Sequence, residues 1–380
     1  GIFMVSRMSP LFEMSDTALS FVMLIGAFTA FFMGLIGIVQ NDIKRVIAYS
    51  TLSQLGYMTV ALGVSAYSAA IFHLMTHAFF KALLFLGAGS VIIAMHHKQD
   101  MKEMGGLRKY MPVTFITGWI GTLALTGFPG FSGFFSKDAI IEATHLSNRW
   151  GSDVAYVAVL LGVFVTALYS FRLLYLTFHG KERMDNHTKE HLKESPWVVT
   201  LPLILLAIPS VIIGWIAIEP MLFGGFLDEA IHVNPANDVV KELGQYHFHG
   251  AASFALHGFQ ALPFWLAFSG FALASYIYMK NIALAGKIRK QMAPVVRILE
   301  NKYGFDAFNQ KFIAGGSVKL GEWLWKWSDS KLIDGMIVNG SAKVVNAVSK
   351  MFRSLQSGYV YHYALVMVVS VIVFISLYIF

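Results

Sequence analysis

Long apolar runs dominate this sequence, and several of them extend for about 18 to 29 residues. A helix of that length crosses the ~30 Å hydrocarbon core of a bilayer, because it rises by about 1.5 Å per residue. Hydropathy therefore predicts an all-α, polytopic membrane protein with about eight transmembrane helices. The expected spans are roughly 17–39, 43–63, 67–95, 112–144, 153–179, 196–218, 263–281 and 358–380.

The basic residues are sorted by membrane side. The formal net charge is +7, with 29 Lys and Arg against 22 Asp and Glu, and such a charge would also suit a nucleic-acid partner. If the spans alternate in direction, however, only Arg7, Arg149 and Lys241 fall on one side, and nearly all other basic residues fall on the opposite side. The positive-inside tendency makes the richer side cytoplasmic. We expect no nucleic-acid partner, a bacterial plasma membrane, cytoplasmic basic loops and a C-terminus on the opposite side.

The segment 112–144 is too long for one straight span, and it contains the cluster TGFPGFSG at 126–133. Proline removes a backbone donor and glycine weakens a helix, so several backbone groups lose their partners at membrane depth. We therefore expect one broken transmembrane helix. A proline kink between packed helices would explain the cluster equally well. Lys137, just after the break, favours an ion site, because broken helices recur around ion sites in transporters.

Two lysines lie inside apolar spans, since Lys81 is the one full charge in 67–95 and Lys137 follows the break. Burying an ionisable group at bilayer depth costs roughly 2.5–3.5 kcal/mol, which favours a functional reason. His73, His77 and Lys81 are spaced four residues apart and therefore share one helix face. Because histidine gains and loses protons near neutral pH, we predict a proton relay made of these three residues and Lys137.

Zinc binding and simple packing are the alternatives for the two histidines. Leu74 follows His73 where the metalloprotease signature has glutamate, and no third ligand is apparent. Two histidines that lead into a buried lysine favour the relay over a packing role. The chain contains no cysteine, which excludes disulfides, thiolate metal sites and iron–sulfur clusters. We expect neither a metal site nor a redox cofactor in this chain.

The second span carries a polar face that could hold water beside the relay. Ser50, Ser53, Gln54 and Tyr57 recur at helical spacing, and Asp42 suits the N-cap of the span.

Other charged residues offer weaker support. Arg172 lies about two turns from the cytoplasmic end of its span, where it either assists the relay or snorkels to the interface. Asp138 and Glu142 lie towards the less basic side, where they would line an outward opening.

The stretch 282–357 is basic and too polar to span a membrane. Its later part places apolar side chains on one helical face, with Lys343, Lys350 and Arg353 off that face. We expect a long amphipathic lateral helix, interrupted at 315–316 and again between 334 and 340. The simplest interpretation is a helix lying in the membrane interface, whereas a length of roughly 100 Å also suits a strap along neighbouring subunits.

Four motifs in order resemble the antiporter-like membrane subunits of respiratory complex I, the NADH-quinone oxidoreductase, in particular the subunit L type. They are DIKRVIAYSTLSQLGYM (42–58), FHLMTHAFFKALLF (72–85), GGLRK (105–109) and GFFSKD (133–138). The resemblance covers the whole chain. The family's first five-helix repeat has no counterpart here, and residues 1–8 read as the tail of an earlier helix. We therefore expect an N-terminally incomplete polypeptide.

The resemblance implies a domain organisation. It implies a preceding helix tail and loop at 1–16, the second five-helix repeat at 17–179, two further spans with a polar loop at 180–281, the lateral helix at 282–357 and a final anchor at 358–380. Within the repeat, Lys81 would be the central lysine and Lys137 the terminal one.

The resemblance also implies a function. The chain would be a proton-translocating subunit of the complex, with no redox chemistry of its own. NADH oxidation and quinone reduction elsewhere would shift the charge state of Lys81. Protons would then pass by His73, His77 and bound water to Lys137, and leave near Asp138. NADH, FMN, iron–sulfur clusters and quinone are expected in partner subunits, and the lateral helix would contact other membrane subunits and the lipid bilayer.

Two alternatives stay open. One is the large subunit of a multisubunit sodium/proton antiporter, or the related membrane subunit of an energy-conserving hydrogenase, although the antiporter chain typically continues beyond the region matched here. The other is a purely structural role, in which the lysines are only packed and the lateral helix clamps neighbours.

Overall fold

The computed structural model describes residues 1–246 and 248–379, which form two compact units, Gly1–Tyr303 and Gly304–Phe380. Helices account for nearly all regular structure in the described residues, and this confirms the expected all-α membrane class. The helices of the first unit are α1 Ile2–Arg7, α2 Ser9–Phe12, α3 Asp16–Val39, α4 Ile43–Gly63, α5 Tyr67–Ala94, α6 Pro112–Thr126, α7 Ser132–Leu146, α8 Ser152–Phe178, α9 Asn186–His191, α10 Trp197–Ile218, α11 Val239–Tyr246, α12 Ala251–Gly258, α13 Leu262–Ser275, α14 Ile282–Gln291 and α15 Ala293–Glu300.

Six helical segments within the described residues are long and apolar enough to cross a membrane. They are Asp16–Val39, Tyr67–Ala94, Ser152–Phe178, Trp197–Phe223, Leu262–Lys280 and Val360–Ile379. Helix α4 is long enough but carries charges and a polar face, and α6 and α7 are the two halves of the broken helix. The expected break is therefore confirmed.

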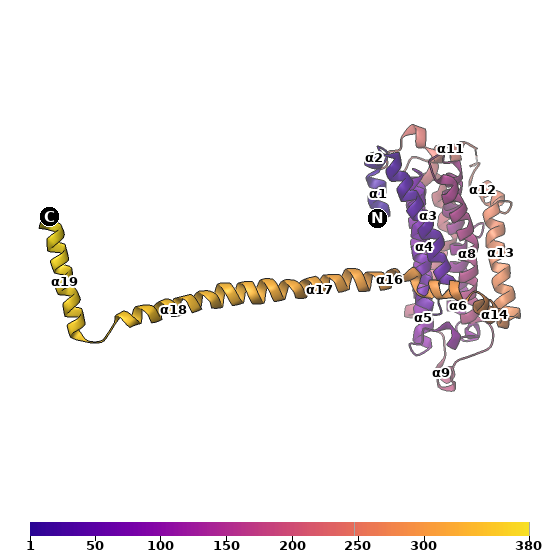
Figure 1. Cartoon of the computed structure of the whole chain (residues 1–380). Coiled ribbons are helices and arrows are strands. Elements are labelled where there is room, and N and C mark those ends of the chain that lie inside the picture. Colours follow the sequence, from indigo (N-terminus) through magenta and orange to yellow (C-terminus); the bar gives the residue numbers. More distant parts are fainter. Residues whose placement is uncertain (247, 380) are drawn as a thin grey trace. The chain divides into compact units, whose positions relative to one another are not determined.

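The first unit is a helical bundle (Figure 1), in which α4 packs against α5, α7 and α8, and α7 also packs against α5 and α8. Helix α3 packs along α4 at close range, since a Cβ placed on Gly56 would lie 2.3 Å from the backbone nitrogen of Ala30. Small residues at such crossings let backbones approach, which helps helices associate in lipid. Helix α4 begins as predicted, because the Asp42 carboxylate accepts the amide of Arg45 at 3.1 Å.

One end of this bundle carries α1, α2, α11 and α12, and the opposite end carries α9 (Figure 1). At the α9 end, Lys98 donates to Asp185 over 2.6 Å, and Asp185 caps α9. This hydrogen bond holds the pKa of Asp185 below its usual range and raises the pKa of Lys98. The pair thus fastens the connector after α5 to the one after α8.

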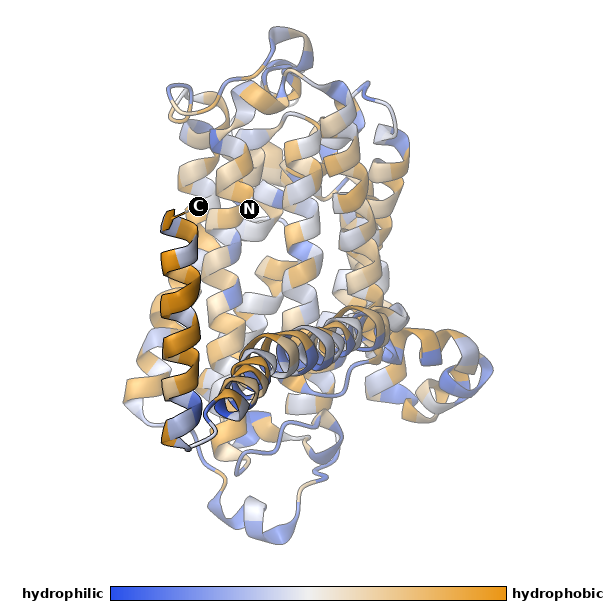
Figure 2. Cartoon of the chain, turned by 60° about the vertical axis from the view of Figure 1, so that its left-hand side comes forward, coloured by the Kyte–Doolittle hydropathy of each residue, from blue (hydrophilic) through white to orange (hydrophobic). Residues whose placement is uncertain are grey.

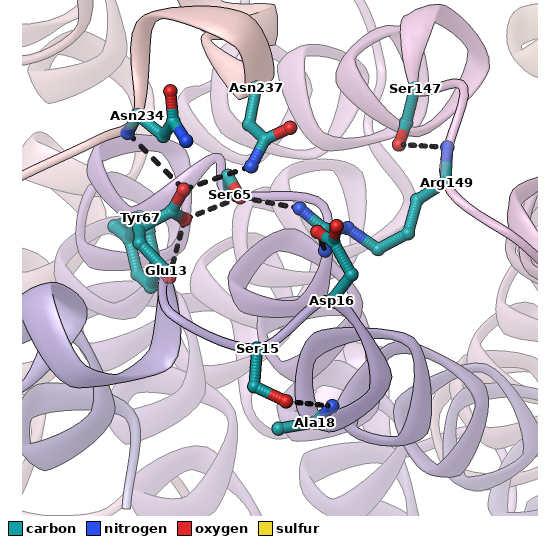
Figure 3. A network of polar contacts seen from close by, with 10 residues as sticks. All are labelled: Glu13, Ser15, Asp16, Ala18, Ser65, Tyr67, Ser147, Arg149, Asn234 and Asn237. Atoms are coloured by element: carbon teal, nitrogen blue, oxygen red, sulfur yellow. Dashed lines mark hydrogen bonds and ion pairs between the residues drawn. The ribbon is translucent and has the colours of Figure 1, made fainter.

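At the other end, Glu13 joins three segments that lie far apart in sequence (Figure 3). Its carboxylate accepts the hydroxyls of Ser65 at 2.6 Å and Tyr67 at 2.9 Å, together with the backbone of Asn234 and the side chain of Asn237. The start of the chain, the α4–α5 turn and the loop before α11 are therefore held together there.

Arg149 extends this network. Its guanidinium bonds Asp16 at 2.5 Å and Ser65 at 3.1 Å, and it lines the same surface cavity as Lys241. Arg7 donates to the carbonyl of Ala230, in the loop that also carries Asn234. The three basic residues that the sequence assigned to the poorer side are thus found at this end, Arg7 at the end of α1, Arg149 in the α7–α8 connector and Lys241 in α11.

The second unit is helical from Phe305 to Leu355 and ends in α19, Val360–Ile379. Within it are α16 Phe305–Phe308, α17 Gly315–Leu324 and α18 Asn339–Leu355, joined by the π-helical stretches Asn309–Ala314 and Trp325–Val338. The expected interruptions at 315–316 and 334–340 are wrong, because Gly315 has right-handed helical dihedral angles and the backbone only widens to π-type turns. Helix α19 is almost uniformly hydrophobic (Figure 2).

The chain does leave helical geometry earlier, at Lys302 and Tyr303, whose φ angles are +51° and +56°. Residues 282–303 belong to the first unit, where the Tyr303 hydroxyl donates to the Phe32 carbonyl at 2.8 Å. A left-handed pair stops a helix, since side chains with a Cβ rarely adopt that conformation. The expected lateral helix therefore comprises separate short helices up to 300 and a continuous helical segment after 304.

Candidate functional site

Lys81 lies buried in the middle of α5 and has a hydroxyl partner on α4. Its Nζ donates to the Ser50 Oγ at 2.7 Å, and that oxygen is also 2.7 Å from the hydroxyl of Tyr169 on α8. Three helices therefore meet at one hydrogen-bonded group. Because a cation in an apolar interior needs polar partners to offset its desolvation, this arrangement stabilises Lys81 where the apolar span alone would not.

His73 lies two turns earlier on α5 and bridges two other helices. Its Nδ1 is 2.8 Å from the Ser136 Oγ on α7, and its Nε2 is 3.2 Å from the Gln54 Oε1 on α4. Thr76 shares the same Ser136 hydroxyl at 2.7 Å. An imidazole with partners at both ring nitrogens can accept a proton on one side and release it on the other.

Lys137 immediately follows Ser136 and faces the aromatic ring of Tyr57. Its Nζ lies 4.7 Å from the ring centroid, and it has no hydrogen-bond partner among the described residues. The Tyr57 hydroxyl is engaged elsewhere, since it donates to the Val159 carbonyl at 2.5 Å. A cation over an aromatic face gains electrostatic stabilisation without a hydrogen bond. Lys137 also lines a small cavity with its neighbour Asp138.

The helix break is built from glycines that tolerate positive φ. Helix α6 ends at Thr126 and is capped by Gly127, with φ +75°, and Gly130 follows with φ +92° before α7 begins. Gly133, in the first turn of α7, lies against α6, because a Cβ there would be 1.9 Å from the Ala124 carbonyl oxygen. The chain thus turns tightly and returns to the helix in time to present Ser136 and Lys137 to α4 and α5.

Helix α4 links these groups. Ser50, Gln54 and Tyr57 follow one another along one face and contact Lys81, His73 and Lys137 respectively. The polar face expected on this span therefore lies directly beside the lysines and the first histidine.

Other expected site residues take different positions. The imidazole of His77 packs edge to face against the ring of Phe80, with 5.3 Å between the ring centroids, and its Nε2 has no hydrogen-bond partner among the described residues. Ser53 donates to the Ala30 carbonyl at 2.6 Å, so it joins α4 to α3 instead of the lysines. Arg172 donates to the Gln40 carbonyl at 2.5 Å and to Asn41 at 2.7 Å, at the connector between α3 and α4.

The sequence patterns did not single out Tyr169, Ser136 or Thr76. Ser136 had a usable signal, since it stands one residue before Lys137 in the same motif and four residues after Ser132. Tyr169 had none, because its relation to Ser50 spans 119 positions and exists only in the folded bundle. Within the described residues, no group of three His, Cys, Asp or Glu is arranged to hold a metal ion.

Residues 1–168 match the model of a protein family described as NADH:quinone oxidoreductase/Mrp antiporter, transmembrane. The chain is also 53% identical over 99% of its length to an NADH-quinone oxidoreductase subunit L of Neisseria meningitidis serogroup A. The chain belongs to this family. The matched part includes every expected site residue except Arg172.

Two further relatives also match nearly the whole chain. A subunit L of Rhodobacter capsulatus is 39% identical over 98% of this chain, and NADH-ubiquinone oxidoreductase chain 5 of Marchantia polymorpha is 38% identical over 99% of it. This chain spans 58% of the Neisseria relative, 60% of the Rhodobacter relative and 56% of the Marchantia relative.

Proposed function

We propose that this chain is a proton-translocating membrane subunit of an NADH:quinone oxidoreductase. The observation that carries this proposal is the single face of α4 that contacts Lys81, His73 and Lys137 in turn. Buried basic groups in a membrane are expensive, and a file of them along one polar face is the arrangement that a proton path needs. The relatives are named as subunits of NADH-quinone oxidoreductase, which supports quinone reduction by NADH as the reaction that drives proton transfer.

In this proposal the charge on Lys81 changes during turnover. When Lys81 is charged, its ammonium holds the Ser50 hydroxyl as an acceptor, and when it is neutral the hydroxyl is free to turn. A proton leaving Lys81 passes by water and His73 to the Ser136 hydroxyl, and then to Lys137. Asp138, beside Lys137, then receives the proton on its way out. His77 lies on the same face of α5 and assists this proton path.

The proposal extends to partners and sidedness. Other subunits of the complex carry NADH, FMN, iron–sulfur clusters and quinone, and this chain carries none of them. The end with α9 faces the cytoplasm, because the lysine- and arginine-rich connectors gather there. The helical segment after residue 304 lies along neighbouring membrane subunits, with its apolar face against protein or lipid.

The test is the proton-to-electron ratio of the assembled complex in membrane vesicles. Lys81→Ala and Lys137→Ala are each expected to lower this ratio strongly, because each removes a buried proton-carrying group. Lys193→Ala, at an exposed lysine on the connector before α10, is the matched control and should leave the ratio unchanged.

An unchanged ratio in both buried-lysine variants would refute the assignment. Replacing sodium by choline in the same assay distinguishes this proposal from the sodium/proton antiporter alternative. A proton-to-electron ratio that depends on sodium would favour the antiporter.

A further inference from the structure

Two small cavities lie in series between Lys81 and the α9 end of the first unit. The nearer one is lined by Lys81 itself, and the second one borders Thr114 at the start of α6. Ile47, Leu84 and Leu173 line both cavities, so the two are direct neighbours. Each has room for about a single water molecule.

The two cavities differ in polarity. The nearer one is bordered by Lys81, Ser50, Tyr169 and Ser170, and the Ser170 hydroxyl is buried without a partner among the described residues. A buried water needs two to four polar partners, and this cavity offers them. The second cavity has the Thr114 hydroxyl as its one polar side chain, among aliphatic and aromatic neighbours. Apolar cavities of this size stay dry.

Beyond the dry cavity, a buried hydroxyl cluster leads to the surface. Thr114 Oγ1 is 2.9 Å from the Ser90 Oγ, and Ser90 is 2.7 Å from the Ser195 Oγ. Thr114 also donates to the carboxylate of the half-buried Glu194 at 2.6 Å. The cluster thus runs from the second cavity to the connector before α10.

Helix capping explains part of this arrangement. The Glu194 carboxylate accepts the backbone amides of Val113 at 2.7 Å and Thr114 at 3.2 Å, which satisfies donors at the start of α6. Capping does not require Ser90 on α5 to join the cluster, nor two cavities aligned towards Lys81. Those features are what a path to the lysine requires.

We propose that this series is a gated access route through which water and protons reach Lys81 from the α9 end. The gate is the apolar lining of the second cavity together with Ile47, Leu84 and Leu173, which separate that cavity from Lys81, and it is closed in this structure. Apolar constrictions block ions and protons by excluding water, and a small widening rewets them. The inference rests on the proposed function for its purpose, and it adds the side and the residues by which Lys81 is loaded.

The test uses the absence of cysteine from this chain. Gly87 lines the dry cavity, and a Cβ added there meets nothing within 4 Å, so Gly87→Cys places a thiol in the route with little strain. Vesicles of the assembled complex are treated from either side with a membrane-impermeant thiol reagent, at rest and during NADH-driven turnover. The readout is the mass increase of this chain after separation.

The expected result is labelling of Gly87→Cys from the α9 side during turnover, weaker labelling at rest, and none from the opposite side. Glu190→Cys, at an exposed position on α9, marks that side, and Ala70→Cys, buried in the other half of α5, should stay unlabelled. Ala88→Cys lines the same cavity and replaces Gly87→Cys if the latter does not assemble.

Absence of labelling in every state, or equal labelling from both sides, would overturn the route. This result is separate from the lysine test. If Lys81→Ala abolishes pumping while the thiols stay unlabelled, the proposed function stands and the route fails. If the thiols are labelled as expected while Lys81→Ala pumps normally, the route stands and the proposed function fails.

Discussion

At the scale of single residues, the site is a set of basic side chains with few partners each. Lys81 has one hydroxyl, His73 has a hydroxyl and an amide oxygen, and Lys137 has an aromatic face. No carboxylate forms an ion pair with either lysine within the described residues. A buried ion pair would fix the charges, whereas sparse neutral partners leave the protonation state free to change.

Replacing Ser50 tests whether a single neutral partner stabilises the charged form of Lys81. Ser50→Ala removes the acceptor of Lys81, and a hydrogen bond to a charged group contributes about 1.5–3 kcal/mol. If that bond stabilises the charged intermediate, pumping turnover should fall roughly tenfold or more, since about 1.4 kcal/mol corresponds to a factor of ten. The measurement is the turnover rate of the assembled complex.

Ser53→Ala is the matched control, because Ser53 is equally buried on α4 but bonds the Ala30 carbonyl. Equal losses in the two variants would indicate a packing effect and contradict a specific role for Ser50.

At the scale of elements, the break between α6 and α7 depends on close backbone contact. The Ala124 carbonyl of α6 lies where a side chain at Gly133 would be, and Gly214 of α10 approaches Ser132 from another direction. The break is therefore wedged between neighbours instead of being a loose hinge. That packing fixes the direction in which α7 sends Ser136 and Lys137.

Gly133→Ala is expected to destabilise the protein, because its Cβ would lie 1.9 Å from a backbone oxygen that cannot rotate away. Overpacking of this kind costs typically about 1–3 kcal/mol. Thermal unfolding of the purified complex or of the chain in detergent measures the effect. Gly87→Ala, in the middle of α5 with open space around the new Cβ, should unfold at the same temperature or higher. A Gly133→Ala variant as stable as Gly87→Ala would contradict the close contact.

At the scale of the whole molecule, the membrane helices of the first unit are fastened at both ends by polar contacts between distant segments. The α9 end has the Lys98–Asp185 pair, and the opposite end has the network around Glu13 and Arg149 (Figure 3). Glu13 reaches Asn237, which is 224 positions away in the sequence. Loops that such a network holds should open less often than loops without one.

Glu13→Ala leaves the hydroxyls of Ser65 and Tyr67 and the amides of Asn234 and Asn237 without their acceptor. Each unmet donor costs up to about 1–3 kcal/mol where it is buried, and less where water can replace the carboxylate. We expect faster hydrogen exchange of the backbone at residues 231–238, measured by mass spectrometry. Glu229→Ala, an exposed residue of the same loop, should leave exchange unchanged, and an equal effect of the two variants would contradict the network.

The sequence predicted the fold class, the break and the polar face of α4 well. Lipid offers no hydrogen bonds to the backbone, so a long apolar run is confined to a helix, and spacing along that helix then fixes which side chains share a face. It failed at 315–316 and 334–340, because glycine only weakens a helix and the surrounding residues keep it formed.

By itself, then, the sequence determined the membrane helices, the position of the broken one and the stripe that runs from His73 to Lys81. Only the tertiary structure decided what that stripe faces. Tyr169 comes to Ser50 from 119 positions away, and Ser136 comes to His73 from 63 positions away. Spacing within one helix cannot encode such neighbours, because the packing of separate helices depends on every close contact along their length.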